Sequence, residues 1–93
     1  MIRSFRHKGL QALHESGKTA GVRHEHAARL RRLLVSLEAA QKPTDMDRPG
    51  NRLHMHKGGV YSGYWAVNVS GAWRLVFRFA GSDVELVDYL NYH

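Results

Sequence analysis

The hydrophobic positions in the first half of the chain recur at the three- and four-residue spacing of amphipathic helices. Residues 2–5 predict a short strand, and Leu10 and Leu13 predict a short helix after it. A longer helix is predicted over residues 22–41, ahead of Pro43. Its apolar stripe consists of Leu30, Leu33, Leu34 and Leu37. This stripe is expected to pack on a sheet, and the His24-Glu25-His26 segment at the helix start is expected to be solvated.

The second half changes to a two-residue period, which is typical of strands. The connection between the halves, residues 42–51, contains both prolines. Period-two segments follow at residues 53–56, 61–69, 73–79 and 84–90. Ser70-Gly71 and Gly81-Ser82 favour tight turns, so the last three segments are predicted to form an antiparallel meander.

The segment 73–79 shows the clearest alternation of apolar and charged residues. Its odd-numbered residues are large and apolar, and they are predicted to face the helices: Trp73, Leu75, Phe77 and Phe79. Arg74 and Arg78 then share the opposite face, about 13 Å apart. They are placed either to contact successive phosphates of a nucleic acid or simply to solvate an exposed face.

Charge and length narrow the class of protein. The 93 residues fit one domain, taken as 1–93, and fourteen Lys and Arg against eight Asp and Glu give a formal charge of +6. Such an excess favours polyanionic partners, nucleic acid first, although it also serves solubility alone. The absence of cysteine excludes disulfides and thiolate catalysis. With no signal-like apolar segment or long apolar run, the chain is expected to be cytoplasmic, without a membrane partner.

Two histidine-containing segments carry candidate chemistry. In Leu53-His54-Met55-His56-Lys57 the strand alternation places His54 and His56 on one side, with Lys57 following at a glycine-rich turn. Imidazoles move protons near neutrality, and a lysine can neutralise a phosphate oxygen. No nearby cysteine or acidic residue completes a metal site, so no metal is expected. The end, Asn91-Tyr92-His93, offers a stacking ring and an imidazole, or else a frayed terminus.

The residue types match the needs of RNA cleavage. That reaction requires a base for the ribose 2′-hydroxyl, cations for the pentavalent phosphate and an acid for the leaving oxygen. No glycine-rich phosphate loop, Gly-X-Ser-X-Gly elbow or carboxylate pair is visible, and no cofactor is expected.

Taken together, several segments resemble the HigB, or plasmid-maintenance killer, branch of the RelE/ParE toxin superfamily. The likeness covers nearly the whole chain. Its carriers are Ile2-Arg3-Ser4-Phe5-Arg6-His7-Lys8-Gly9-Leu10, Leu53-His54, Lys57-Gly58, Gly63-Tyr64-Trp65, Trp73-Arg74-Leu75-Val76-Phe77-Arg78-Phe79 and Tyr92-His93.

The resemblance implies an α+β, RelE-like fold with two N-terminal helices packed on a twisted, mainly antiparallel β-sheet. It implies the toxin of a type II toxin–antitoxin system, a metal-independent, ribosome-dependent endoribonuclease that cleaves mRNA in the A site of the 70S ribosome. The implied partner is a HigA-like helix-turn-helix antitoxin, through which operator DNA is contacted indirectly.

The resemblance also implies roles for individual residues. His54 and His93 become proton-transfer candidates, Lys57 and Arg74 phosphate or transition-state contacts, and Tyr92 a residue that positions the mRNA. The expected RNA contacts besides these catalytic residues are Lys8, His56, Arg78 and Asn91.

Two positions depart from the family pattern. Asn91 stands where such toxins usually carry an acid, and Ala72 stands where they often carry Asn. Both changes affect the expected catalytic power more than the fold, and Asp88, three residues before Asn91, need not substitute for the acid. The competing interpretations are a ParE-like toxin that inhibits gyrase, a non-catalytic nucleic-acid-binding module, and a basic surface that docks an acidic antitoxin.

Overall fold

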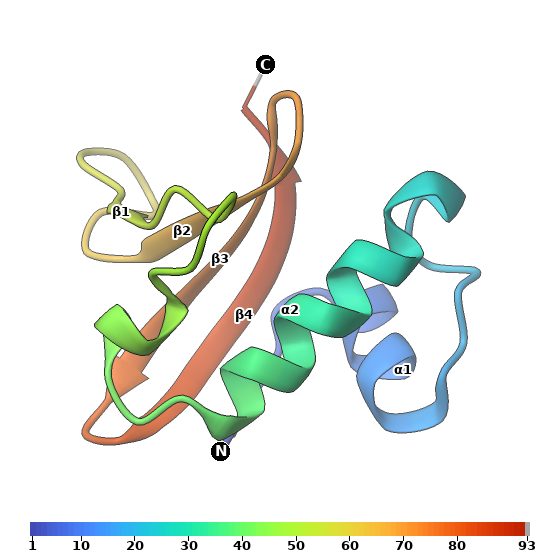
Figure 1. Cartoon of the computed structure of the whole chain (residues 1–93), viewed down its shortest axis with the longest axis horizontal. Helices are drawn as coiled ribbons and strands as arrows, with labels where there is room; N and C mark the ends of the chain where they lie inside the picture. The colour runs from blue at the N-terminus through green and yellow to red at the C-terminus, as the bar shows by residue number, and fades with distance from the viewer. Residues whose placement is uncertain (93) are drawn as a thin grey trace.

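The computed structural model describes residues 1–92 of the chain. Within this range the α-helices are α1 (Lys8–Ser16) and α2 (Ala27–Ala39), and the 3₁₀ turns are η1 (His24–His26) and η2 (Pro43–Met46). The strands are β1 (His54–Met55), β2 (Trp65–Ser70), β3 (Trp73–Ala80) and β4 (Asp83–Asn91), paired antiparallel in this order. Figure 1 shows both α-helices on the same side of the twisted sheet. The predicted α+β architecture is confirmed.

Helix α2 is shorter than the predicted segment 22–41. Its leucine stripe is buried as predicted, with none of the four leucines more than 3% exposed. The start differs, because Arg23 is extended and a 3₁₀ turn precedes the α-helix. The prediction of a solvated start is wrong for His26, which is only 5% exposed. No helix in residues 1–92 combines the length and the apolar character that crossing a membrane would require.

The main core lies between the helices and the sheet. Leu75 and Phe77 of β3 are fully buried there, and Trp73 and Phe79 pack against the same cluster, which confirms the predicted orientation of the strand. Leu10 and Leu13 of α1 complete the helical side of this core. At about 25 cal/mol per Å² of buried apolar surface, this layer is the main source of stability.

Three predicted strands are wrong in extent. The segment 53–56 forms only the two-residue β1, and the segment 61–69 becomes strand only from Trp65. Glycines explain the second difference, because Gly58, Gly59 and Gly63 have positive φ values of 78°, 68° and 86° and turn the chain through residues 58–64. Residues 2–5 form isolated parallel bridges to β4 rather than a strand.

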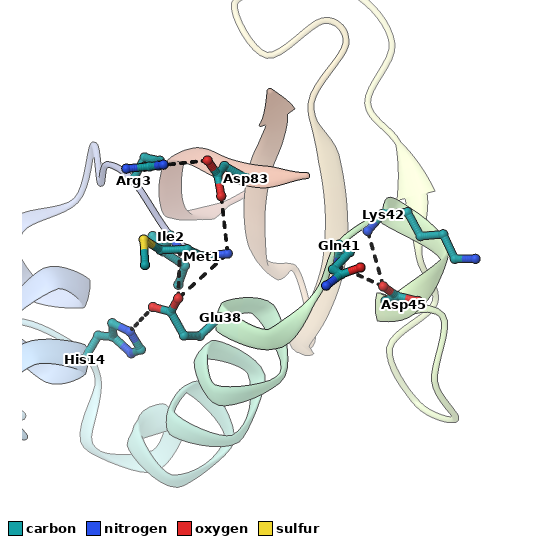
Figure 2. Close-up of polar contacts among 9 residues, drawn as sticks. All are labelled: Met1, Ile2, Arg3, His14, Glu38, Gln41, Lys42, Asp45 and Asp83. Carbon is teal, nitrogen blue, oxygen red and sulfur yellow. Dashed lines mark hydrogen bonds and ion pairs between the residues drawn. The ribbon is translucent and has the colours of Figure 1, made fainter. Parts of the chain in front are cut away.

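The N-terminal segment covers the outer edge of β4. The Met1 ammonium lies 3.8 Å from the Glu38 carboxylate and 3.7 Å from that of Asp83, and Figure 2 shows it between the two. The Ile2 N–H also donates to Glu38, and the Arg3 guanidinium lies 2.8 Å from Asp83. These contacts close an edge that would otherwise expose unpaired backbone groups.

A β-bulge bends β4 beside this segment. Val76 pairs with Asp88 and Arg78 with Glu85, so β4 contains one residue more than β3 between these pairs. Leu86 takes a positive φ of 56° there, and its N–H donates to the Ser4 hydroxyl at 2.9 Å. The bulge increases the local twist of the sheet.

Candidate active site

The face of the sheet turned away from the helices, here called the open face, carries the candidate chemistry. By cross-strand register and side-chain alternation it presents Tyr64, Ala66, Arg74, Val76, Arg78, Asp88 and Leu90. The predicted placement of Arg74 and Arg78 on one face is confirmed. The face is not merely solvated, because Tyr64, Ala66 and Val76 form a second buried cluster beneath the cations.

A histidine, a tyrosine and an arginine meet at one end of the open face. The His56 ring lies edge-on to Tyr92, with centroids 5.2 Å apart, and the Arg74 guanidinium lies over the Tyr92 ring at 5.1 Å. Two buried nitrogens of this trio, His56 Nδ1 and Arg74 Nε, have no hydrogen-bond partner within residues 1–92. Unpaired buried polar atoms are costly, by about 1–3 kcal/mol each, and they often mark functional sites.

Arg74 is held in place by the turn that precedes it. Its Nη1 donates to the carbonyl oxygens of Gly71 at 2.6 Å and Trp73 at 3.0 Å. The Tyr92 N–H donates to the Ala72 carbonyl at 3.0 Å, which ties the end of the chain to the same turn. This backbone contact does not depend on the side chain at position 72. A guanidinium group is thus fixed beside an aromatic ring.

Tyr92 combines exposure with an apolar setting. Its side chain is 38% exposed, and burial raises the pKa of its phenol, while Arg74 acts in the opposite direction. The hydroxyl therefore stays protonated at neutral pH. The residue suits stacking on a base better than accepting a proton.

Further cations and aromatic rings extend this site along the sheet. Arg78 lies over the Tyr64 ring at 5.8 Å, and Arg6 donates to the Tyr64 hydroxyl at 3.4 Å. Arg6 also lies over Tyr61 at 5.4 Å, and its hydrogen bond to Tyr64 is the main cause of its raised pKa. Sequence reasoning missed Arg6, Tyr61 and Tyr64 as site residues. The cluster of tyrosines around Gly63 was the available signal.

The predicted site residues divide into two groups. The structure brings His56, Arg74 and Tyr92 into contact, and it places Arg78 on the same face. His54 shares this face because it pairs with Ala66, but its Nδ1 lies 2.8 Å from the Arg52 carbonyl and its side chain is exposed. The predicted common side for His54 and His56 agrees with this register.

The remaining predicted site residues are Lys57, Lys8, Asn91 and His93. Lys57 is exposed and makes no hydrogen bond or ion pair within the described chain. Lys8 begins α1, and no hydrogen bond, ion pair or ring contact among residues 1–92 joins it to the trio. Asn91 is the register partner of Trp73, whose side chain packs on the helix side, so the ladder does not bring Asn91 to the open face. His93 lies outside the described residues.

The open face offers what phosphodiester chemistry needs. An imidazole is available for proton transfer, fixed guanidinium groups for anionic oxygens, and aromatic rings for bases. Arg74 and Arg78 present planar guanidinium groups, which can pair with two phosphate oxygens at once. The arrangement therefore suits a single-stranded nucleic acid laid across the sheet.

Comparison with known proteins identifies the family. The family model described as "RelE-like toxin of type II toxin-antitoxin system HigB" matches residues 3–93. The chain is also 37% identical over 93 residues, covering 100% of both sequences, to a protein named Endoribonuclease HigB from Proteus vulgaris. The structure carries the helices and antiparallel sheet expected of this family. The chain belongs to the HigB family of RelE-like toxins of type II toxin–antitoxin systems.

Proposed function

We propose that this toxin is an endoribonuclease that cleaves mRNA in the A site of the ribosome. The observation that supports this most directly is the trio of His56, Arg74 and Tyr92 on the open face, with two buried nitrogens that have no hydrogen-bond partner within residues 1–92. The full-length likeness to a protein named as an endoribonuclease supports the same activity. A face able to stack bases and hold phosphates is the surface that such a reaction needs.

The proposed reaction is an in-line attack by the ribose 2′-oxygen on the adjacent phosphorus. The new bond joins the 2′-oxygen to phosphorus, and the bond from phosphorus to the 5′-oxygen of the next nucleotide breaks. A base takes the 2′-hydroxyl proton and an acid protonates the leaving 5′-oxygen, so the products are a 2′,3′-cyclic phosphate and a 5′-hydroxyl. This balance requires no metal ion.

We assign the steps to residues as follows. His54 and His93 are the proton-transfer candidates, and Arg74 and Lys57 stabilise the charge that builds on the phosphoryl oxygens. Tyr92 stacks on a base next to the cut. The further RNA contacts are Lys8, His56, Arg78 and Asn91. Among them, His56 packs edge-on against the Tyr92 ring.

A type II toxin has an antitoxin partner. We propose that the partner is a HigA-like helix-turn-helix protein, and that this partner supplies the contact with operator DNA. The basic surface of the toxin, formal charge +6, favours both an acidic antitoxin and ribosomal RNA. A ribosomal target places the toxin in the cytoplasm, which the lack of cysteines suits.

The test is primer-extension mapping of a reporter mRNA translated in the presence of this toxin. We expect in-frame cuts that require 70S ribosomes and are absent on naked RNA. The cuts should vanish with His93→Ala and persist with His24→Ala, a control at an exposed histidine of η1. Product ends with a free 5′-hydroxyl support the proposed chemistry.

Two results would overturn the proposal. Inhibition of gyrase supercoiling with intact mRNA would place the protein with the ParE-like toxins. Salt-dependent RNA binding with no cleavage on ribosomes would make it a binding module. Unchanged cleavage after removal of both the His54 and His93 side chains would contradict the assigned proton transfers.

A further inference from the structure

The loop that carries Lys57 has a backbone with little intrinsic rigidity. Residues 56–64 connect β1 and β2 and contain three glycines at positive φ, with open space around each of their Cα positions. Lys57 is exposed, and Val60 is 76% exposed. At the base of the loop the His56 N–H donates to the Tyr64 carbonyl at 2.7 Å, and the Gly63 N–H donates to the His56 carbonyl at 3.1 Å. A glycine-rich loop of this kind needs a side-chain anchor to keep one conformation.

One long-range hydrogen bond supplies that anchor. The Tyr61 hydroxyl donates to Asp88 Oδ2 of β4 at 2.6 Å, across 27 residues of sequence. The other carboxylate oxygen of Asp88, Oδ1, accepts the N–H of Tyr89 at 2.8 Å, so the carboxylate is oriented by the backbone of its own strand. The hydrogen bond to Asp88 is the main cause of the raised pKa of Tyr61, which keeps the phenol protonated as a donor.

The Tyr61 ring lies between the anchor and the trio. It packs edge-on against Tyr64 at 5.1 Å and against His56 at 6.2 Å, and Arg6 covers it at 5.4 Å. A displaced Tyr61 would therefore remove a neighbour of His56 and release the backbone on either side of Lys57. Both effects reach residues assigned above to RNA binding and cleavage.

We propose that Tyr61 and Asp88 are positioning residues, a latch that holds the 56–64 loop against β4 and thereby sets His56 and Lys57 relative to Tyr92 and Arg74. The expected effect of the latch on RNA cleavage rests on the proposed nuclease function, whereas the latch itself does not. Both oxygens of Asp88 accept hydrogen bonds within the fold. Asp88 therefore serves as an acceptor and does not replace the acidic residue that such toxins usually carry at the position of Asn91.

The first arm of the test does not depend on RNA. Brief trypsin treatment of the folded protein reports opening of the loop by the rate of cleavage after Lys57, and cleavage after Lys18 in the α1–α2 connection serves as the internal control. Tyr61→Phe and Asp88→Ala should raise the Lys57 rate about tenfold, the factor that corresponds to about 1.4 kcal/mol, and leave the Lys18 rate unchanged. Asp88→Asn keeps one oxygen that can accept from Tyr61 but loses the oxygen that accepts the Tyr89 N–H, so its Lys57 rate should fall between those of the unmodified protein and Asp88→Ala.

The second arm measures ribosome-dependent cleavage. Tyr61→Phe and Asp88→Ala should lower kcat about tenfold, because His56 and Lys57 are then no longer held in one arrangement and a small misplacement of site groups slows the reaction. The pH dependence of kcat should stay unchanged. Asp88→Asn should restore part of the rate, and Asp83→Ala at the far end of β4 is the matched control. Thermal unfolding of each variant shows whether the chain is still folded.

The outcomes separate the latch from the nuclease. Faster Lys57 cleavage in Tyr61→Phe, without ribosomal cleavage by the unmodified protein, supports the latch and contradicts the proposed function. Equal Lys57 rates in all variants overturn the latch. If Asp88→Asn is as inactive as Asp88→Ala and loses one limb of the pH profile, Asp88 transfers protons and the positioning role is wrong.

Discussion

A histidine–tyrosine pair lies on each face of the sheet, and the two pairs differ in the hydrogen bonding of the histidine ring. On the helix side, His26 Nδ1 lies 2.5 Å from the Tyr89 hydroxyl, and both side chains are buried. On the open face, His56 meets the Tyr92 ring edge-on, and its Nδ1 has no partner within residues 1–92. The same residue types thus serve packing on one face and remain available to a ligand on the other.

Each histidine–tyrosine pair also has an arginine nearby, and residues of β3 lie beside both pairs. Trp73 stacks on Tyr89 at 4.8 Å, and Arg23 lies over Trp73 at 5.7 Å. The next residue of β3, Arg74, points to the other face and covers Tyr92. Strand alternation alone sends these neighbours to different environments. A buried polar network stabilises the fold when every donor and acceptor in it is paired. An incompletely paired network lowers the stability of the fold, and a bound substrate can supply the missing hydrogen bonds.

The largest effect should come from the open-face cation. Arg74→Ala should lower ribosome-dependent cleavage by about 10²–10³-fold, because removal of one preorganised donor to a developing anion has this magnitude. The melting temperature should change little. Arg23→Ala, the corresponding cation on the helix side, is the control and should leave the cleavage rate unchanged. Equal losses of activity in both variants would show that the two faces of the sheet do not differ in their role in cleavage.

The helix-side pair should show the opposite behaviour. Tyr89→Phe removes the hydroxyl that pairs with His26 and should lower the free energy of unfolding by about 1–3 kcal/mol, the cost of leaving a buried polar group unpaired. Tyr92→Phe at the open face should leave this free energy nearly unchanged. Denaturant titration of the two variants measures both values, and a stability loss confined to Tyr92→Phe would reverse the assignment.

The role of the Tyr92 ring can be separated from that of its hydroxyl. Tyr92→Ala should reduce cleavage about tenfold, since stacking on a base contributes about 1–3 kcal/mol. Tyr92→Phe keeps the ring and should stay within a few-fold of the unmodified toxin. Steady-state cleavage of a translated reporter compares them. A Phe variant as slow as the Ala variant would show that the hydroxyl, and not the ring, matters.

The smallest expected effect is on the pH dependence of stability, through the ion pair at the edge of the sheet. The Arg3 guanidinium lowers the pKa of Asp83 in the folded state, so the native chain binds fewer protons than the unfolded one. The stabilisation is present above the unfolded pKa of about 3.9 and is lost as the pH falls through the folded pKa. Urea midpoints at about pH 6 and about pH 3 should differ less in Asp83→Asn. Identical differences would show that the Arg3 contact adds no measurable stability.

Much of the fold could be predicted because it depends on local periodicity. The leucine stripe of α2 and the alternation of β3 each mark one apolar face, and a two-layer α+β structure buries both. Alternation likewise predicted that Arg74 and Arg78 share a face opposite Phe77. The extents of the strands were less predictable, because the backbone at Gly58, Gly59 and Gly63 turns a segment whose side chains still look strand-like.

The candidate site was predictable only by residue type. The amino-acid sequence by itself determined the basic charge, the apolar faces, and the presence of His56, Arg74 and Tyr92. Tertiary structure alone decided that His26 is buried against Tyr89, 63 residues away, and that Tyr61 reaches Asp88. Periodicity tells which side of an element is apolar. It does not tell which distant side chain arrives there, because that depends on how the helices and the sheet pack together.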